Sequence, residues 1–310
     1  MNTYISVRKS QIHFYLETPL YIKNDKGNFI LYKAENIKID HSRFSEDAFP
    51  QLYIPEEMKE TAFEELQGQL KEKLKERVNS GDLKSVKSVL SKIVQEAIQE
   101  PLEENLQTLP ETLDIIYQEY SNTTNILKNI AGLQFGGSTL VEHSTNVMLL
   151  VLNYCIFKRL PDEDTKKLSL GELLHDVGLA RIPKQITEAN HKLSDSEFNT
   201  YKTHTIIGHD IIKESKHIDS LIAVGVHEHH ERLNGTGYPR SLSKISFEGR
   251  LIGLIDCFDN LTNNVKSHRK KKDPFGAMKI IQNEILKEDL FDKYIFKDLC
   301  LSLLGKSKYS

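Results

Sequence analysis

The chain has 310 residues, of which 39% are hydrophobic and 27% are charged, and its formal net charge is −3. This balance is typical of a globular protein with a sizeable core, and it excludes bulk attraction to nucleic acid or to an anionic membrane. The length predicts one large and one small domain.

Neither the cysteines nor the apolar runs indicate export. The three cysteines have no CxxC spacing, so they do not suggest a disulfide framework. The first residues lack the apolar stretch of a signal peptide, and the most apolar run, residues 147–157, is shorter than a membrane span. We therefore expect a soluble, cytoplasmic protein that contacts neither membrane nor nucleic acid.

Residues 1–55 are predicted to form a small β-rich accessory module. Aromatic and β-branched residues lie on both sides of Asn24-Asp25-Lys26-Gly27. Such a sequence is typical of a hairpin whose turn glycine takes a positive φ.

Residues 56–124 are predicted to form a helical connector. Apolar residues recur every three or four positions from Phe63 to Val78, and again from Leu83 to Ile98, which predicts two amphipathic helices. These helices pack either within the chain or against a second copy, as a homodimer. The first alternative is favoured, because the apolar repeat is short for a coiled coil.

Residues 125–310 are predicted to be almost entirely helical, and Ser194 with Glu197 forms a capping-box start. The predicted fold class is therefore mainly α, with a C-terminal helical bundle that follows the small β-containing (α+β) module and the connector.

Seven histidines and aspartates, spread over several apolar segments of the C-terminal half, are candidate metal ligands. Imidazole and carboxylate groups together suit two divalent metals that share a bridging oxygen, an arrangement typical of phosphodiester hydrolysis. The candidates are His143, His175, Asp176, His204, His229, His230 and Asp256.

The adjacent pair His175-Asp176 is central to this hypothesis. Gly178 and Pro183 follow it, so the pair is predicted at the end of a helix, where Asp176 can bridge two metals. One partition gives the first metal His143, His175, Asp176 and Asp256, and the second metal Asp176, His204, His229 and His230.

The motifs around these residues resemble those of the HD-GYP family, the branch of the HD superfamily whose members hydrolyse cyclic di-GMP. The resemblance covers about residues 125–310. It rests on His143-Ser144, His175-Asp176-Val177-Gly178 with Ile182-Pro183, His204 with Gly208, His229-His230-Glu231-Arg232, Asn234-Gly235-Thr236-Gly237-Tyr238-Pro239, and Asp256-x-x-Asp259-x-Leu261-Thr262.

The resemblance implies a metal-dependent cyclic di-GMP phosphodiesterase domain over residues 125–310. Its metals would be iron or manganese, with zinc as an alternative, and Asp176 would be catalytic. A metal-bridging hydroxide would open cyclic di-GMP to pGpG, and further cleavage would give GMP. Gly237 and Tyr238, in the segment that gives the family its name, are expected to contact the substrate.

Three positions depart from the family pattern. Leu179 stands where a phosphate-binding lysine is common, and Arg181 is the nearby candidate to replace it. In the basic segment after the Asp256 motif, Lys266 and Arg269 lie one position out of register. Thr139 replaces the glutamate of three-metal members, which favours two metals.

These departures leave a second function open beside the leading one. The alternative is a metal-loaded receptor with weak turnover, which binds cyclic di-GMP or a partner such as a diguanylate cyclase.

Overall fold

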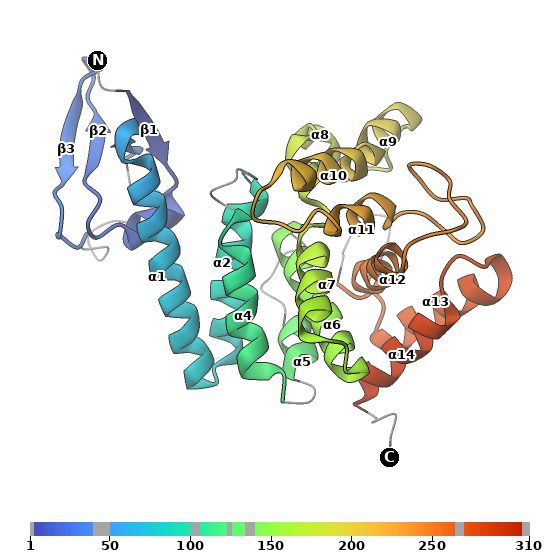
Figure 1. The fold of residues 1–310 in the computed structure, drawn as a ribbon. Coiled ribbons are helices and arrows are strands. Elements are labelled where there is room, and N and C mark those ends of the chain that lie inside the picture. The colour runs from blue at the N-terminus through green and yellow to red at the C-terminus, as the bar shows by residue number, and fades with distance from the viewer. Residues whose placement is uncertain are drawn as a thin grey trace. The chain divides into compact units, whose positions relative to one another are not determined.

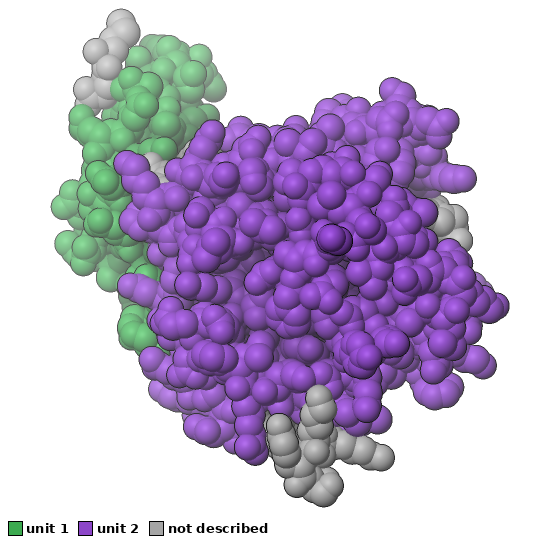
Figure 2. All heavy atoms as spheres, turned by 45° about the vertical axis from the view of Figure 1, so that its right-hand side comes forward, with its two compact units in different colours: residues 1–76 green, residues 77–310 purple. Residues whose placement is uncertain are grey.

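The computed structural model describes residues 3–39, 50–99, 101, 106–122, 126–133, 140–263 and 270–305. The chain forms two compact units, Met1–Glu76 and Arg77–Ser310 (Figure 2). All the strands among the described residues lie in the first unit, and the second unit is helical. The predicted mainly α fold with a small N-terminal β-containing part is confirmed. The division at residues 55 and 124 stays a prediction.

The first unit contains a four-stranded antiparallel sheet of order β1-β4-β2-β3. Its hairpin turn is the predicted one, because Gly27 has a φ of 82° and the Asn24 amide donates to the Asn28 carbonyl at 2.9 Å. The elements are β1 (Tyr4–Val7), η1 (Lys9–Phe14), β2 (Leu20–Lys23), β3 (Phe29–Lys33), β4 (Leu52–Pro55), η4 (Glu56–Met58) and α1 (Lys59–Ser80).

Two charged side chains hold residues 16–18 between them. The Lys33 ammonium donates to the carbonyls of Leu16 and Thr18 at 2.7 and 2.8 Å. The Glu65 carboxylate, on α1, accepts from the amides of Glu17 and Thr18 at 2.6 and 2.9 Å. The backbone groups of this connection are thereby paired, and α1 is tied to the sheet.

The second unit is built around one buried helix, α6 (Leu140–Lys158), which packs against α2, α5, α7, α12 and α14 (Figure 1). By length and composition α6 would also suit a membrane, but 67% of its most apolar window is buried inside the protein, as in a core helix. The other helices are α2 (Leu83–Gln99), α4 (Leu109–Tyr120), α5 (Ile126–Gly132), α7 (Asp162–Leu174), η5 (Val177–Arg181), α8 (Lys184–Thr187), α9 (Asp195–Lys202), α10 (His204–Glu214), α11 (Ile222–Glu228), α12 (Phe247–Thr262), α13 (Pro274–Glu288) and α14 (Lys293–Leu304).

Both helices predicted for the connector form, as α1 and α2. Their apolar stripes, which include Leu70 and Leu74 on α1 and Leu90 and Val94 on α2, are buried. The buried Lys87 of α2 also donates to the Ala131 carbonyl near the end of α5, at 2.9 Å. These stripes are thus buried in the single chain, and a homodimer through residues 56–124 stays a prediction.

Two glycines allow helices to approach backbone to backbone. A Cβ at Gly178, in η5, would lie 2.0 Å from the His204 carbonyl oxygen and 2.7 Å from the Gly208 nitrogen. A Cβ at Gly253, in α12, would lie 2.2 Å from the His229 carbonyl oxygen. Only glycine permits contacts this close, and each one brings together two segments that carry candidate ligands.

We expect Gly178→Ala to lower the free energy of unfolding by about 1–3 kcal/mol, because the added methyl group cannot be accommodated without moving η5 from α10. Urea unfolding followed by circular dichroism measures this. The control is Gly132→Ala, whose Cβ would meet nothing within 4 Å and which should leave stability unchanged or raise it by up to about 1 kcal/mol. Equal effects of the two substitutions would show that the close approach of η5 to α10 does not contribute to stability.

Candidate metal centre

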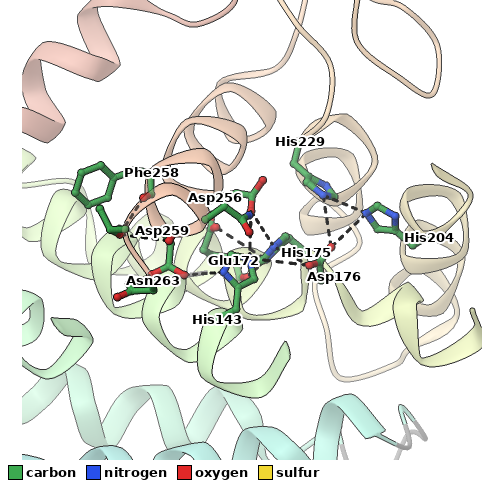
Figure 3. A network of polar contacts seen from close by, with 12 residues as sticks. His143, Glu172, His175, Asp176, His204, His229, Asp256, Phe258, Asp259 and Asn263 are labelled. Carbon is green, nitrogen blue, oxygen red and sulfur yellow. Dashed lines mark hydrogen bonds and ion pairs between the residues drawn. The ribbon is translucent and has the colours of Figure 1, made fainter. Parts of the chain in front are cut away.

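The structure brings all seven candidate ligands to one place, from five helices or their ends. Figure 3 shows six of them, and His230 lies beside His229 and His204. His204 begins α10 as predicted, and His175-Asp176 follows the last residue of α7 as predicted. His143 lies on α6, His229 and His230 directly follow α11, and Asp256 lies in the middle of α12.

The carboxylate of Asp176 lies between two groups of imidazoles. Its Oδ1 is 3.2 Å from Nε2 of His204 and 3.8 Å from Nε2 of His229. Its Oδ2 is 3.4 Å from Nε2 of His175 and 4.0 Å from Nε2 of His143. Each oxygen of this buried carboxylate thus faces its own pair of ring nitrogens.

The distances between potential ligand atoms divide most of the candidates into two groups, which resemble the two sets predicted from the sequence. One group, with potential ligand atoms within 4.8 Å of one another, is Asp176, His204, His229 and His230, and the other is His143, His175 and Asp176. Asp256 adjoins the second group, because its Oδ1 lies 3.1 Å from Nε2 of His143 and 3.9 Å from Nε2 of His175. The assignment of each residue to a metal stays a prediction.

Three of the histidines are oriented by the same local hydrogen bond. In His175, His204 and His229 the ring Nδ1 lies 2.6 Å from a backbone carbonyl oxygen three residues upstream. A carbonyl only accepts, so we assign the proton to Nδ1, which leaves the lone pair of Nε2 directed into the centre. The acceptors are the carbonyls of Glu172, Tyr201 and Val226.

This arrangement suits divalent cations. Nε2 of His204 lies 3.4 Å from Nε2 of His229 and 3.2 Å from Oδ1 of Asp176, so lone pairs face one another. Nε2 of His175 and Oδ1 of Asp176 are buried without a hydrogen-bond partner among the described residues. Buried polar atoms are rarely left unpaired, and a cation among them would satisfy these atoms together.

Asp259 is a further site residue, which is not among the seven candidate ligands predicted from the sequence. It is almost completely buried, and its Oδ2 accepts from Nδ1 of His143 at 2.7 Å. Its Oδ1 accepts a hydrogen bond from the side-chain amide of Asn263 at 2.6 Å. The available signal was the spacing of Asp256 and Asp259, because residues three apart share one helix face.

The two groups of imidazoles differ in their affinity for protons. Burial lowers the pKa of His143, but hydrogen bonds to Asp256 and Asp259 outweigh it and hold this pKa well above its usual range. Burial also opposes protonation of His175, yet the nearby Asp176 raises its pKa to about 9. Burial, together with the neighbouring histidines, lowers the pKa of His229 to about 3.

The segment after the paired histidines is fixed by two buried glutamates. Glu231 accepts from the backbone amides of Arg240 and Leu242 at 2.7 and 2.8 Å. Glu228 accepts from the Arg240 guanidinium at 2.6 Å and from the Ser246 amide at 2.7 Å. Residues 240–246 are therefore held against the segment that carries His229 and His230.

Tyr238 lies beside the second group of imidazoles. Its ring centroid is 4.6 Å from that of His230 and 6.4 Å from that of His204. Gly237 makes this position possible, because a Cβ there would lie 2.4 Å from the Glu231 Cα. Contact of Tyr238 and Gly237 with a substrate stays a prediction.

The other predicted site residues are placed only in part. Leu179 is buried in η5, and Arg181 is exposed at the end of the same turn. Thr139, Lys266 and Arg269 lie outside the described residues, so the arguments that rest on them stay predictions.

Comparison with known proteins identifies the family. Residues 104–294 match the HD domain family. The chain is 29% identical over 175 residues to the cyclic di-GMP phosphodiesterase PA4108 of Pseudomonas aeruginosa, a match that covers 56% of this chain and 41% of that protein. It is 32% identical over 132 residues to the cyclic di-GMP phosphodiesterase response regulator RpfG of Xanthomonas campestris, covering 41% of this chain and 33% of that protein.

A third relative differs in its named substrate. The 3'3'-cGAMP-specific phosphodiesterase 1 of Vibrio cholerae is 30% identical over 146 residues, which cover 46% of this chain and 33% of that protein. The chain thus spans less than half the length of each of these three relatives.

A solved structure shares the fold of almost the whole chain. It is described as Bd1817, an HDG"Y"P protein from Bdellovibrio bacteriovorus, with a TM-score of 0.62 and 20% identity. The match covers 96% of this chain and 98% of that one. With the family match and the motifs around the metal centre, the chain belongs to the HD domain family and, within it, to the HD-GYP branch.

Proposed function

We propose that this protein is a metal-dependent phosphodiesterase that opens cyclic di-GMP to pGpG, with GMP as the product of further cleavage. The observation that carries the proposal is the Asp176 carboxylate, each of whose oxygens faces a separate pair of imidazole nitrogens. The names of the relatives PA4108 and RpfG support cyclic di-GMP as the substrate. We propose a cytoplasmic location.

Two bound divalent ions would lower the pKa of a shared water towards neutrality and stabilise the charge that develops on the phosphoryl group. We propose iron or manganese, with zinc as an alternative, because mixed imidazole and carboxylate ligation suits them. His143, His175, Asp176 and Asp256 would hold one ion. Asp176, His204, His229 and His230 would hold the other.

Residues of this chain would orient the metal ligands and the substrate phosphate. Asp176 is the proposed catalytic residue, because its position between the two groups sets where the reacting oxygen and the phosphate meet. The carbonyls behind His175, His204 and His229 and the Asp259 carboxylate behind His143 fix the ring planes. Partners of this kind commonly change metal affinity or activity by about 10- to 100-fold.

A second function is favoured by one observation, the buried Leu179. Leucine offers no positive charge to a phosphate, so the alternative is a metal-loaded receptor that binds cyclic di-GMP, or a partner such as a diguanylate cyclase, with weak turnover. A homodimer through residues 56–124 is a separate proposal, which is independent of the choice between enzyme and receptor.

Turnover by the reconstituted protein separates these functions. Protein loaded with Fe²⁺ or Mn²⁺ is mixed with cyclic di-GMP, and pGpG is followed by chromatography. The proposal expects multiple turnovers that stop when a chelator is added. Tight binding of cyclic di-GMP without cleavage, at full metal content, would contradict the enzyme and support the receptor.

We expect Asp176→Asn to lower kcat by about 10²–10³-fold or more and to lower the metal content, because the amide removes the charge shared by both groups. Metal analysis and initial rates measure this. Asp210→Asn is the control, since the Asp210 side chain is 62% exposed and should affect neither quantity. Normal activity of Asp176→Asn would exclude the bridging role.

We expect acidification to remove metal from the His143–His175 group first. The pKa of His175 is raised to about 9 and that of His229 is lowered to about 3, so a proton competes with a cation at His175 over a pH range in which His229 stays deprotonated. Metal content, measured by mass spectrometry as pH falls from about 9 to about 6, should decrease from two ions towards one. Simultaneous loss of both ions would contradict this order.

We expect Leu179→Lys to raise kcat for cyclic di-GMP by up to about 10²–10³-fold, since loss of one positioned donor at a developing negative charge commonly costs this much. Steady-state kinetics at constant metal content measures the gain, and Leu179→Met controls for repacking of η5. A properly loaded lysine variant with unchanged kcat would show that Leu179 does not limit turnover.

A further inference from the structure

His143 lies between two carboxylates of α12 (Figure 3). Its Nε2 is 3.1 Å from Oδ1 of Asp256, and its Nδ1 donates to Oδ2 of Asp259 at 2.7 Å. The two aspartates are three residues apart and both are buried, so one face of α12 presents both of them to α6. The orientation of the His143 ring therefore depends on how these two carboxylates are held.

Each of the two aspartates accepts a hydrogen bond from an asparagine four residues further along the chain. The side-chain amide of Asn260 donates to Oδ1 of Asp256 at 2.5 Å, and that of Asn263 donates to Oδ1 of Asp259 at 2.6 Å. Residues i and i+4 share a helix face. The spacing Asp-x-x-x-Asn thus occurs twice between residues 256 and 263, and the aspartate of each pair contacts His143.

An asparagine amide donates a hydrogen bond to a carboxylate without adding a charge. A lysine or arginine in its place would repel a divalent cation beside Asp256, and an apolar side chain would remove the donor. A carboxylate oxygen has two lone pairs, so Oδ1 of Asp256 accepts from Asn260 while it still faces His143. The bond therefore restricts rotation of the carboxylate and leaves its full charge available to a cation.

The two asparagines lie at different removes from the candidate centre. Asp256 is itself a candidate ligand, whereas Asp259 reaches the centre through Nδ1 of His143. Asn260 is thus bonded directly to a candidate ligand, and Asn263 is one residue further away. Loss of a hydrogen bond to a ligand commonly changes metal affinity by about 10- to 100-fold, so the larger effect is expected of Asn260.

We propose that Asn260 is a positioning residue that sets, through Asp256, the affinity of the His143–His175 group for a divalent cation. Asn263 supports the same group more weakly, through Asp259. The inference rests on the proposed function because it requires a cation at this group, but it does not require that cyclic di-GMP is turned over.

The test is calorimetric titration of the metal-free protein with Mn²⁺, which measures the affinity for each ion. Asn260→Ala should weaken the binding of one ion about 10- to 100-fold and change that of the other less than about threefold. Asn260→Gln keeps an amide that can reach an aspartate one helical turn away, so it should restore most of the lost affinity. If the alanine variant does not fold, Asn260→Leu replaces it, because leucine has a similar size and no donor.

Asn283→Ala is the matched control, because Asn283 is an exposed asparagine on α13 and should change neither affinity. A double substitution shows whether Asn260 acts through Asp256. Asp256→Ala removes the candidate ligand, so Asn260→Ala should weaken Mn²⁺ binding no further in that background.

Three results would overturn the inference. Asn260→Ala could bind both ions as the unmodified protein does, or it could weaken both ions equally, as a general loss of structure would. Its effect could also be undiminished in the Asp256→Ala background, which would show that it does not act through Asp256.

Failure of the proposed function has a different signature. An unmodified protein that binds two Mn²⁺ ions but does not cleave cyclic di-GMP contradicts the enzyme, and the affinities of the Asn260 variants still decide the inference. An unmodified protein that binds fewer than two ions overturns the inference itself.

Discussion

The position of one buried carboxylate organises this protein. Asp176 presents its two oxygens to imidazoles that come from different helices. With their protons on Nδ1, the rings of His204 and His229 direct the lone pairs of Nε2 at one carboxylate oxygen and at one another, whereas the nearby Asp176 favours a second proton on His175. Such an arrangement is unfavourable unless a positive charge lies within it. The fold therefore positions groups that repel one another, as a site prepared for cations would.

The rest of the second unit keeps these groups in place. Gly178 and Gly253 let the segments approach backbone to backbone, so the ligand-bearing helices cannot slide without a clash. Glu228 and Glu231 hold the following loop through charge-assisted hydrogen bonds to backbone amides. These contacts do not involve the candidate ligand atoms, so they support the site in addition to any bonds between those atoms and a metal.

Much of this was predictable because the relevant signals are local. Apolar periodicity located α1 and α2, and Gly178 with Pro183 marked the helix end where His175 and Asp176 lie. The motif order also indicated which histidines share a group. Local signals could not show that α1 belongs mostly with the sheet, since the units divide between Glu76 and Arg77.

Other features depend on the arrangement of helices in space. The carbonyl partners of the ring nitrogens are backbone atoms and leave no mark in the residue types. In the sequence, Asp259 was marked only by its position three residues after Asp256. Its contact with His143 joins residues that are 116 positions apart.

The most direct test of the central claim is a crystal structure of protein loaded with manganese or iron, with the ions located by anomalous scattering. The account predicts two peaks about 3.5–4 Å apart, one beside each oxygen of Asp176. One peak lies near His143 and His175, and the other near His204, His229 and His230. A single peak, or two ions that do not share Asp176, would contradict it.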